Sequence, residues 1–356
     1  MKKKLSLILS LLLMTAPLSA CSSSASENKE PKETPAAEQK ETKEETGAVE
    51  TDAFPVTIKH AFGETVIEEK PERVVTLAFG NQDVVLALDI VPVGFSAANY
   101  GVQDDSGMLP WTQEKLAALG ETNPNVFQDT DGFDYEAIAA CDPDIILMPY
   151  SGLNEEEYKL LSEIAPVVAY PEGAWTISTE DWIRVTAKAL GVEEKGEELV
   201  KKMNDTIAAK VAEHPELSDS TFVWISFDAN DLSNLHAYSP VDTRCAFLYQ
   251  FGLKYPESVN QYITEDSYSL AISSENADIL YDTDFLIGYS SQEAYDAAAA
   301  DPVLGEIPAL KKNAVVAIDS GTPLSAALTI TPLSFDYCID EYIDKIVEAI
   351  GHAKSE

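Results

Sequence analysis

Residues 193–213 of the chain read EEKGEELVKKMNDTIAAKVAE. Apolar side chains recur along this stretch at helical spacing, and it contains no proline and a single glycine, Gly196, near its start. Glu197 with Lys201 is one of two i,i+4 pairs of opposite charge that support a helix. At about 1.5 Å per residue, the helix is a stiff rod of roughly 30 Å. The stretch therefore predicts a bridge between two folded halves.

Strand and helix patterns alternate on both sides of this bridge. Before it, an alternating hairpin pattern occupies 56–58 and 65–67, apolar runs predict strands at 74–79, 91–95, 145–149 and 167–170, and helical patterns fall at 82–88, 135–140 and 155–164. After it, we expect strands at 222–227, 285–289 and 315–318, and helices at 243–251, 274–280, 292–300 and near 335–350. Such alternation is typical of parallel α/β organisation.

The chain after residue 52 is longer than a single hydrophobic core usually serves. We therefore predict an N-terminal α/β lobe at 53–192, a bridging helix at 193–213 and a C-terminal α/β lobe at 214–356. The halves also echo one another, because 136–147 (EAIAACDPDIIL) and 275–287 (ENADILYDTDFLI) both show a helix, an Asp and a buried strand. Two α/β lobes joined by a single long helix leave a ligand cleft between them.

The N-terminal residues have the pattern of an export signal. Basic residues at 2–4 precede an apolar run at 5–13 that is too short to span a bilayer, so residues 1–20 are expected to be removed as a signal peptide. Leu-Ser-Ala-Cys at 18–21 resembles the lipobox of bacterial lipoproteins, and this resemblance implies diacylation of Cys21. Residues 21–52 contain no large apolar residue before Val49 and predict a disordered, lipid-anchored tether. The alternative is an ordinary signal peptide with an incidental cysteine.

Composition excludes several classes of partner and site. The formal net charge of -37 disfavours nucleic acid and anionic membrane surfaces. Cys141, Cys245 and Cys338 are odd in number and lack CxxC spacing, which predicts buried thiols. The four histidines are scattered, and the chain has no GxSxG, P-loop or GxGxxG motif. We therefore expect neither an enzyme, nor a resident metal, nor a cofactor.

Several short stretches together resemble a known family. They are KPERVV at 70–75, LALDIVPVG at 86–94, YEAI at 135–138, DPDIIL at 142–147 and IAPVVAY at 164–170. They resemble the helix-linked, class III substrate-binding proteins of ABC importers, and most of all the ferric-siderophore branch. YSPVDTRCAFL at 238–248 looks like the ligand loop of that branch. The resemblance implies a monomeric, extracytoplasmic lipoprotein that captures a ferric siderophore and delivers it to an ABC importer.

The candidate ligand-binding residues are those expected at the carboxyl ends of strands, where open α/β sheets bind ligands. An iron chelate calls for aromatic walls and hydrogen-bond donors, because its metal is already coordinated. The alternative for each aromatic residue is packing against loops. The strand-end candidates are Phe79, Asn81, Tyr100, Tyr150, Ser151, Trp175, Phe227 and Tyr289. The ligand-loop resemblance adds Tyr238 and Arg244, whose planar cation suits a carboxylate or catecholate oxygen.

Other candidates carry open alternatives. Arg244 either contacts ligand or forms a surface salt bridge with Asp242. Trp111 either covers the cleft or anchors its own loop. His236 beside Tyr238 has the chemistry of an axial haem ligand, which keeps a haem or cobalamin binding protein as the alternative function. A structural or adhesive surface lipoprotein is the alternative from another class.

The sequence also gives expectations for docking to the permease and for the charge of the ligand. In the resembled family an acidic residue on each lobe docks against arginines of the permease, and the resemblance places these at Glu136 and Glu275. The alternative is two solvated helix residues. The acidic balance of the chain favours a neutral or weakly charged chelate, such as a hydroxamate, over an anionic catecholate.

Overall fold

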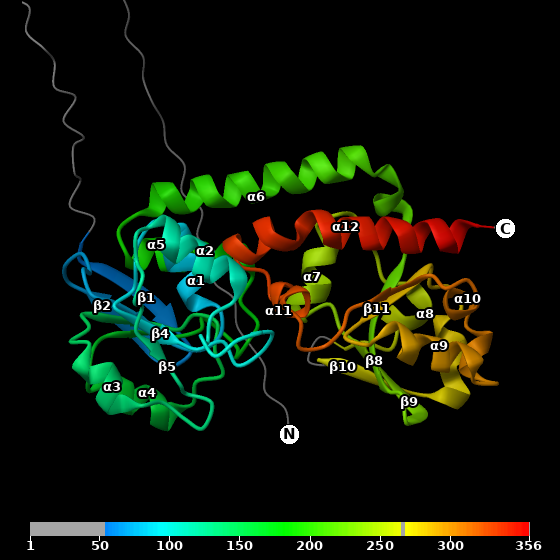
Figure 1. Ribbon diagram of the computed structural model, residues 1–356, viewed down its shortest axis with the longest axis horizontal. Coiled ribbons are helices and arrows are strands. Elements are labelled where there is room, and N and C mark those ends of the chain that lie inside the picture. The colour runs from blue at the N-terminus through cyan, green and yellow to red at the C-terminus, as the bar shows by residue number, and fades with distance from the viewer. Residues whose placement is uncertain (1–53, 265–267, 356) are drawn as a thin grey trace, which may run out of the picture. The chain divides into compact units, whose positions relative to one another are not determined.

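The computed structural model describes residues 54–264 and 268–355 (Figure 1). The expected signal peptide, Cys21 and the tether lie outside these residues. Within the described ranges, no helix has the length and apolar character needed to cross a membrane.

The N-terminal lobe opens with an antiparallel hairpin of β1 (Val56–His60) and β2 (Gly63–Ile67). A five-stranded sheet follows, in the order β5-β4-β3-β6-β7, and its pairings are all parallel. Its strands are β3 (Val74–Thr76), β4 (Gly94–Ser96), β5 (Val126–Phe127), β6 (Ile145–Leu147) and β7 (Val167–Val168). Its helices are α1 (Asn81–Ala87), α2 (Pro110–Ala118), α3 (Tyr135–Ala140), α4 (Glu155–Ser162) and α5 (Thr179–Ala189).

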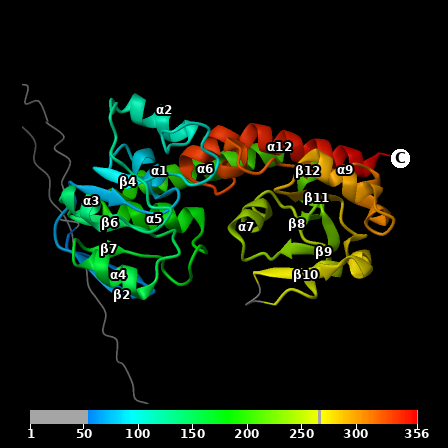
Figure 2. The ribbon, with the colours of Figure 1, turned by 60° about the horizontal axis from the view of Figure 1, so that its bottom comes forward.

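The C-terminal lobe contains a mixed five-stranded sheet in the order β10-β9-β8-β11-β12 (Figure 2). Its strands are β8 (Phe222–Asp228), β9 (Asp231–Tyr238), β10 (Ser269–Ser273), β11 (Phe285–Gly288) and β12 (Val315–Ala317). Its smaller helical elements are η1 (Pro215–Asp219), α7 (Thr243–Tyr249), α8 (Glu257–Asn260), η2 (Ser274–Leu280), α9 (Gln292–Ala300), η3 (Leu304–Glu306), α10 (Pro308–Lys311) and α11 (Pro323–Ala327). The pairings of β9 with β8 and with β10 are antiparallel, and neither β9 nor β10 is among the strands expected from the sequence.

Two long helices run past both lobes. The predicted bridge is α6 (Glu193–Glu213), with the expected bounds. The closing helix α12 (Pro332–Lys354) is longer than the predicted 335–350, and its N-terminal end packs on α1 and α2 of the N-terminal lobe. Figure 1 shows α6 and α12 side by side. The two α/β lobes are thus joined by one long helix in the chain and braced by a second.

The sequence similarity between the two halves has a counterpart in the structure. Asp144, before β6, accepts hydrogen bonds from the backbone N–H groups of Glu72 and Arg73, which precede β3. Asp284, before β11, accepts from the backbone N–H of Thr221, which precedes β8. In both lobes one carboxylate therefore fixes the start of a central strand against its neighbour. The 274–280 segment is helical as expected, and it is a 3₁₀ helix whereas its counterpart α3 is an α-helix.

The apolar core crosses the lobe boundary. Val84, Trp111 and Trp182 of the N-terminal lobe belong to the same buried cluster as Trp224 and the body of α12. Continuous packing of this kind resists independent movement of the lobes. Cys141, Cys245 and Cys338 are free and buried, which confirms the prediction of buried thiols.

Candidate ligand-binding site

Arg244 lies on a shelf of aromatic rings in the C-terminal lobe. Its guanidinium carbon is 4.5 Å from the ring centroid of Tyr238, 5.0 Å from Tyr289 and 5.2 Å from Trp224. Its Nε donates to Asp242 Oδ1 at 2.8 Å and its Nη2 to Asp242 Oδ2 at 2.5 Å. Such distances to the rings permit cation–π attraction. The rings and the carboxylate together fix the plane of the guanidinium.

The Arg244–Asp242 pair is charged although it is buried. The side chains of Arg244 and Asp242 are 13% and 1% exposed. Burial opposes ionisation of each group, but the hydrogen bonds between them outweigh it, so the pKa of Arg244 is raised and the pKa of Asp242 is lowered. A guanidinium has five N–H groups, of which Asp242 takes two and the phenol of Tyr289 another. Further donors remain for a ligand oxygen, while the net charge of the pair is zero.

Three aromatic rings of the N-terminal lobe, those of Trp175, Tyr150 and Trp182, form a row that we call the aromatic ladder. The ring of Trp175 meets Tyr150 edge-on at 5.0 Å, and Tyr150 stacks on Trp182 at 4.8 Å. The Trp182 Nε1 donates to Asn81 Oδ1 at 3.0 Å, and the Asn81 amide donates to the carbonyl oxygens of Leu77 and Tyr150. Asn81 therefore holds the base of the ladder. Trp175 at the other end is 41% exposed and offers its ring to a ligand.

The two sets of strand-end residues meet at the lobe junction. The phenol of Tyr150 shares hydrogen bonds with Thr243 and Thr329 of the C-terminal lobe, and burial raises its pKa. The phenol of Tyr100 lies 2.9 Å from Ser320 Oγ, and its ring is 6.3 Å from that of Tyr289. Because these residues follow strands of both sheets, the junction fits the rule that α/β sheets bind ligands outside the carboxyl ends of their strands.

A pocket of ≈ 260 Å³ opens at the strand ends of the N-terminal lobe. Its lining includes Phe79, Asn99, Asp129, Phe133, Glu157 and Trp175. Gly152 leaves room for the Trp175 ring in this position, since a Cβ there would lie 2.7 Å from the indole Nε1. Trp175 connects this pocket to the junction, because its ring also contacts that of Tyr150.

The structure brings eight of the twelve sequence-predicted ligand residues to these surfaces. Tyr238, Arg244 and Tyr289 form the shelf, Tyr100 and Tyr150 meet them across the junction, and Phe79, Ser151 and Trp175 line the pocket. The hydroxyl of Ser151, however, is buried and donates to the Met148 carbonyl oxygen at 2.9 Å. Ser151 therefore lines the pocket, but its hydroxyl proton is used in this bond and is not free to be donated to a ligand.

The other four predicted ligand-binding residues do not contribute to the shelf, the junction or the pocket. Asn81 is buried with its amide fully bonded, so it positions Trp182 and not a ligand. Trp111 is 4% exposed and donates to Asp83 at 2.7 Å, which places it as the anchor of α2, not a cover. Phe227 packs on Tyr295 at 5.4 Å. His236 is exposed on β9, between Ser226 and Ala271 of the flanking strands.

Sequence reasoning missed several residues of the site. Trp224 and Tyr268 complete the surroundings of the Arg244–Asp242 pair, and Asp129 and Glu157 enter the pocket. Trp224 lies inside an apolar strand, where it resembles any core residue. Asp129 follows β5, whose two residues are too few to give a strand pattern. Glu157 is the third residue of α4 and appears in the sequence only as part of a capping box.

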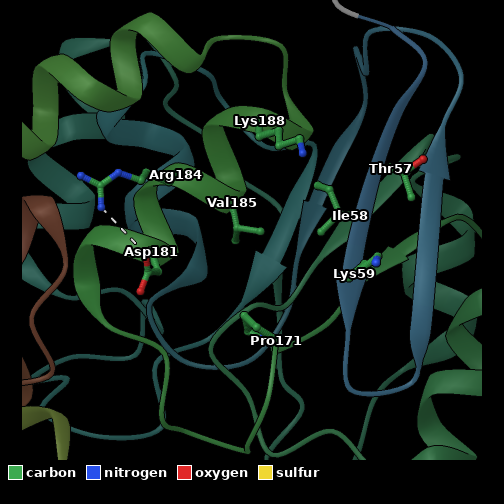
Figure 3. A pocket seen from close by; sticks show the side chains of 8 residues that line it. All are labelled: Thr57, Ile58, Lys59, Pro171, Asp181, Arg184, Val185 and Lys188. Atoms are coloured by element: carbon green, nitrogen blue, oxygen red, sulfur yellow. Dashed lines mark ion pairs between the residues drawn. The ribbon is translucent and has the colours of Figure 1, made fainter. Parts of the chain in front are cut away.

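A larger pocket of ≈ 560 Å³ lies away from the strand ends, between β1 and α5 (Figure 3). Its cationic lining residues are Lys59, Arg184 and Lys188. Arg184 is already paired with Glu180 and Glu197, both at 2.9 Å, and points away from the hairpin in Figure 3. The pocket thus lacks the convergence of aromatic and polar groups found at the junction.

The two proposed docking residues occupy equivalent, accessible positions. Glu136 is the second residue of α3 and Glu275 the second residue of η2, and both are exposed. In the described ranges 54–264 and 268–355, no group of three or more His, Cys, Asp or Glu side chains gathers as metal ligands.

Comparisons with known proteins give the family. A crystal structure of Streptococcus pneumoniae TIGR4 PiaA in complex with ferrichrome has a TM-score of 0.78 and 43% identity, covering 84% of this chain and 99% of that one. The ferric enterobactin-binding periplasmic protein FepB of Escherichia coli O6:H1 is 26% identical over 293 residues, which are 77% of this chain and 87% of FepB. The ferric-anguibactin-binding protein FatB of Vibrio anguillarum is 27% identical over 305 residues, 81% of this chain and 87% of FatB.

The family model described as periplasmic binding protein matches residues 74–322, which run from β3 of the first sheet to the loop after β12 of the second. The match includes α6 and every residue of the shelf and the pocket described above. The chain belongs to the periplasmic binding protein family.

Proposed function

We propose that this protein captures a ferric siderophore outside the cell and delivers it to an ABC importer. The observation that carries the proposal is Arg244, a buried cation with spare N–H donors, held over three aromatic rings at the junction of two α/β lobes. A ferric siderophore offers the matching chemistry, because flat, partly apolar arms surround a metal whose coordination is complete. The arms pack on rings and their outward oxygens accept from the guanidinium.

Ligand charge favours a neutral chelate of the hydroxamate type. The charge of Arg244 is balanced by Asp242, and the chain as a whole carries a formal net charge of -37. A ferric tricatecholate is an anion, and this site offers it no unbalanced cation. The similar PiaA structure holds ferrichrome, whose ferric hydroxamate core is neutral.

The test is titration of the mature chain with ferrichrome, a ferric tricatecholate, haem and cobalamin, followed by quenching of intrinsic Trp fluorescence. Trp175, Trp182 and Trp224 lie at or beside the site and report its occupation. We expect submicromolar quenching by the hydroxamate. Binding of haem alone would transfer the site to His236 and refute the proposal, and so would failure of all four ligands to bind.

Anchoring and delivery follow the same proposal. Cleavage before Cys21 and diacylation of its thiol would tether the protein to the outer face of the cell membrane as a monomer. Glu136 and Glu275, exposed at equivalent positions of the two lobes, would meet basic residues of a permease with two-fold symmetry. Mass spectrometry of the mature N-terminal peptide tests the anchor, because this peptide should carry the labelled lipid.

A further inference from the structure

The pocket at the N-terminal strand ends is acidic within a site whose other charges cancel. Its lining contains two carboxylates, Asp129 and Glu157, and no Lys or Arg. Among the described residues, neither carboxylate takes part in an ion pair. Across the junction, Asp242 balances Arg244. The whole site therefore carries a net negative charge that is concentrated in this pocket.

Asp129 is held in place by a buried relay. The backbone N–H of Ala78 donates to Ser96 Oγ at 2.9 Å, and the Ser96 hydroxyl donates to Asp129 Oδ2. Ser96 is 2% exposed, so this orientation is fixed from inside the sheet. Burial raises the pKa of Asp129, and the bond from Ser96 opposes that rise. A partly desolvated carboxylate without a cation is stabilised by a cationic ligand.

Glu157 adds a second acceptor from a rigid helix end. Its Oε2 accepts the backbone N–H of Asn154 at 3.0 Å, as part of the capping box of α4. No described hydrogen bond uses its other oxygen. The capping interaction orients the side chain, while one oxygen is available to the pocket.

Aromatic rings provide the remaining walls. Phe79, Phe133 and Trp175 line the pocket together with the carboxylates. Ring faces attract organic cations, and combined with carboxylates they suit an ammonium group better than a metal ion or a neutral alkyl chain. At ≈ 260 Å³ the pocket is smaller than the sites of whole drug-sized ligands, about 300–1,000 Å³, so it accepts one arm of a chelate.

We propose that this pocket is a subsite for a protonated primary amine carried on one arm of a ferric trishydroxamate. The metal core of such a ligand is neutral and suits the balanced Arg244–Asp242 pair, while its ammonium arm lies between the rings and the carboxylates of the pocket. The inference rests on the proposed function and deepens it: among ferric trishydroxamates, those that carry an ammonium arm should bind more tightly than those that do not.

A matched pair of ligands tests the subsite. Ferrioxamine B carries one terminal ammonium group, and its N-acetyl derivative has the same ferric core without that charge. We expect the wild-type protein to bind ferrioxamine B about tenfold more tightly than the acetylated ligand, a difference of ~1.4 kcal/mol. The difference should shrink with rising salt concentration, because it is a charge interaction in a partly exposed pocket.

Two conservative variants locate the effect. Asp129→Asn keeps an acceptor for Ser96, and Glu157→Gln keeps the capping box, so both should fold. Each should reduce the tenfold preference to about threefold, and the double variant should abolish it. Glu156→Gln, on the exposed neighbour of Glu157, is the control and should leave the preference unchanged.

These measurements can refute the amine subsite without refuting the proposed function. Equal wild-type affinities for the two ligands, or a preference that survives in the double variant, would overturn the subsite and leave siderophore capture standing. Failure of both ligands, and of ferrichrome, to bind would overturn the proposed function and the subsite with it.

Discussion

Arg244 is the residue on which the chemistry of the site depends most directly. Its side chain is 13% exposed, and its partner Asp242 is 1% exposed, so removal of the guanidinium affects both ligand binding and the buried carboxylate. Rings on three sides restrict the guanidinium to one plane. A lysine at this position would keep the charge and lose the two-point contact with Asp242.

Arg244→Ala should weaken siderophore binding by about 1.5–3 kcal/mol, the usual range for a hydrogen bond to a charged group. The siderophore affinity of Arg244→Lys should lie between that of Arg244→Ala and that of the wild type. Affinity is measured by Trp quenching, with the melting temperature recorded alongside, because an unpaired Asp242 also lowers stability. Wild-type affinity in a folded Arg244→Ala protein would remove this residue from the ligand contacts.

The sequence made Arg244 visible and left Asp129 hidden for different physical reasons. Arg244 is one of few arginines in an acidic chain and lies in a stretch of eleven residues that resembles a family ligand loop. Asp129 follows a strand of two residues, which leaves no periodicity to read. Trp111 and Asn81 were visible as polar or aromatic loop residues, but only their burial shows that they hold the scaffold.

At the scale of elements, helices with full amphipathic turns were predictable, and the polar, antiparallel strand β9 was not. The bounds of α6 and α9 agree with the predicted ranges, because each has clear helical spacing. The antiparallel strand β9 reads DLSNLHAY, and half of it is polar and exposed, so it lacks the apolar run of a buried parallel strand. The confirmed fold class therefore rests on the parallel strands and on α6.

Asp83 connects three elements in one buried contact. Its carboxylate accepts from Trp111 Nε1 at 2.7 Å and Thr112 Oγ1 at 2.7 Å, both on α2, and from Thr331 Oγ1 at 3.0 Å. Thr331 is the N-cap of α12, so the contact fastens α12 to the N-terminal lobe. Burial raises the pKa of Asp83 to about 6, and these hydrogen bonds oppose the rise.

The raised pKa makes stability depend on pH with a definite sign. Between the ordinary carboxyl value of 3.8 and about 6, the folded state binds a proton that the unfolded state has lost. The free energy of unfolding should therefore fall by about 2–3 kcal/mol as pH rises from 4 to 7. Urea unfolding at several pH values measures this.

Asp83→Asn supplies the comparison for that measurement. The variant should lack this part of the pH dependence, because a neutral amide has no proton to lose in this range. Asp89→Asn is the control, since Asp89 is exposed and the bond to Lys115 lowers its pKa. An Asp83→Asn curve parallel to the wild type would show that Asp83 does not titrate in this range.

The whole molecule is built to resist wide opening. The helix α6 links the lobes, the buried cluster containing Trp182 and Trp224 crosses their boundary, and Thr179 Oγ1 donates to the Ile330 carbonyl oxygen at 2.9 Å. We expect ligand binding to change the radius of gyration by less than about 1 Å, measured by small-angle scattering of free and loaded protein. A decrease of several ångströms would indicate a hinge that this packing does not provide.

Delivery should depend on two charges that the fold places in equivalent positions. Asp144 and Asp284 fix equivalent strand starts, and Glu136 and Glu275 precede them on exposed helical turns. If a two-fold symmetric permease contacts both, we expect each lobe to supply half of the contact.

Glu136→Lys and Glu275→Lys should each reduce siderophore uptake about three- to tenfold, and the double variant should nearly abolish it, while Trp quenching gives an unchanged affinity for ligand. Uptake is measured with iron-55 chelate in cells whose own copy is replaced by the variant. Glu156→Lys, an equal charge reversal at another exposed position of the N-terminal lobe, is the control and should transport normally. If all three single variants lose uptake equally, net charge and not these two sites governs docking, since a specific contact must distinguish Glu136 from Glu156.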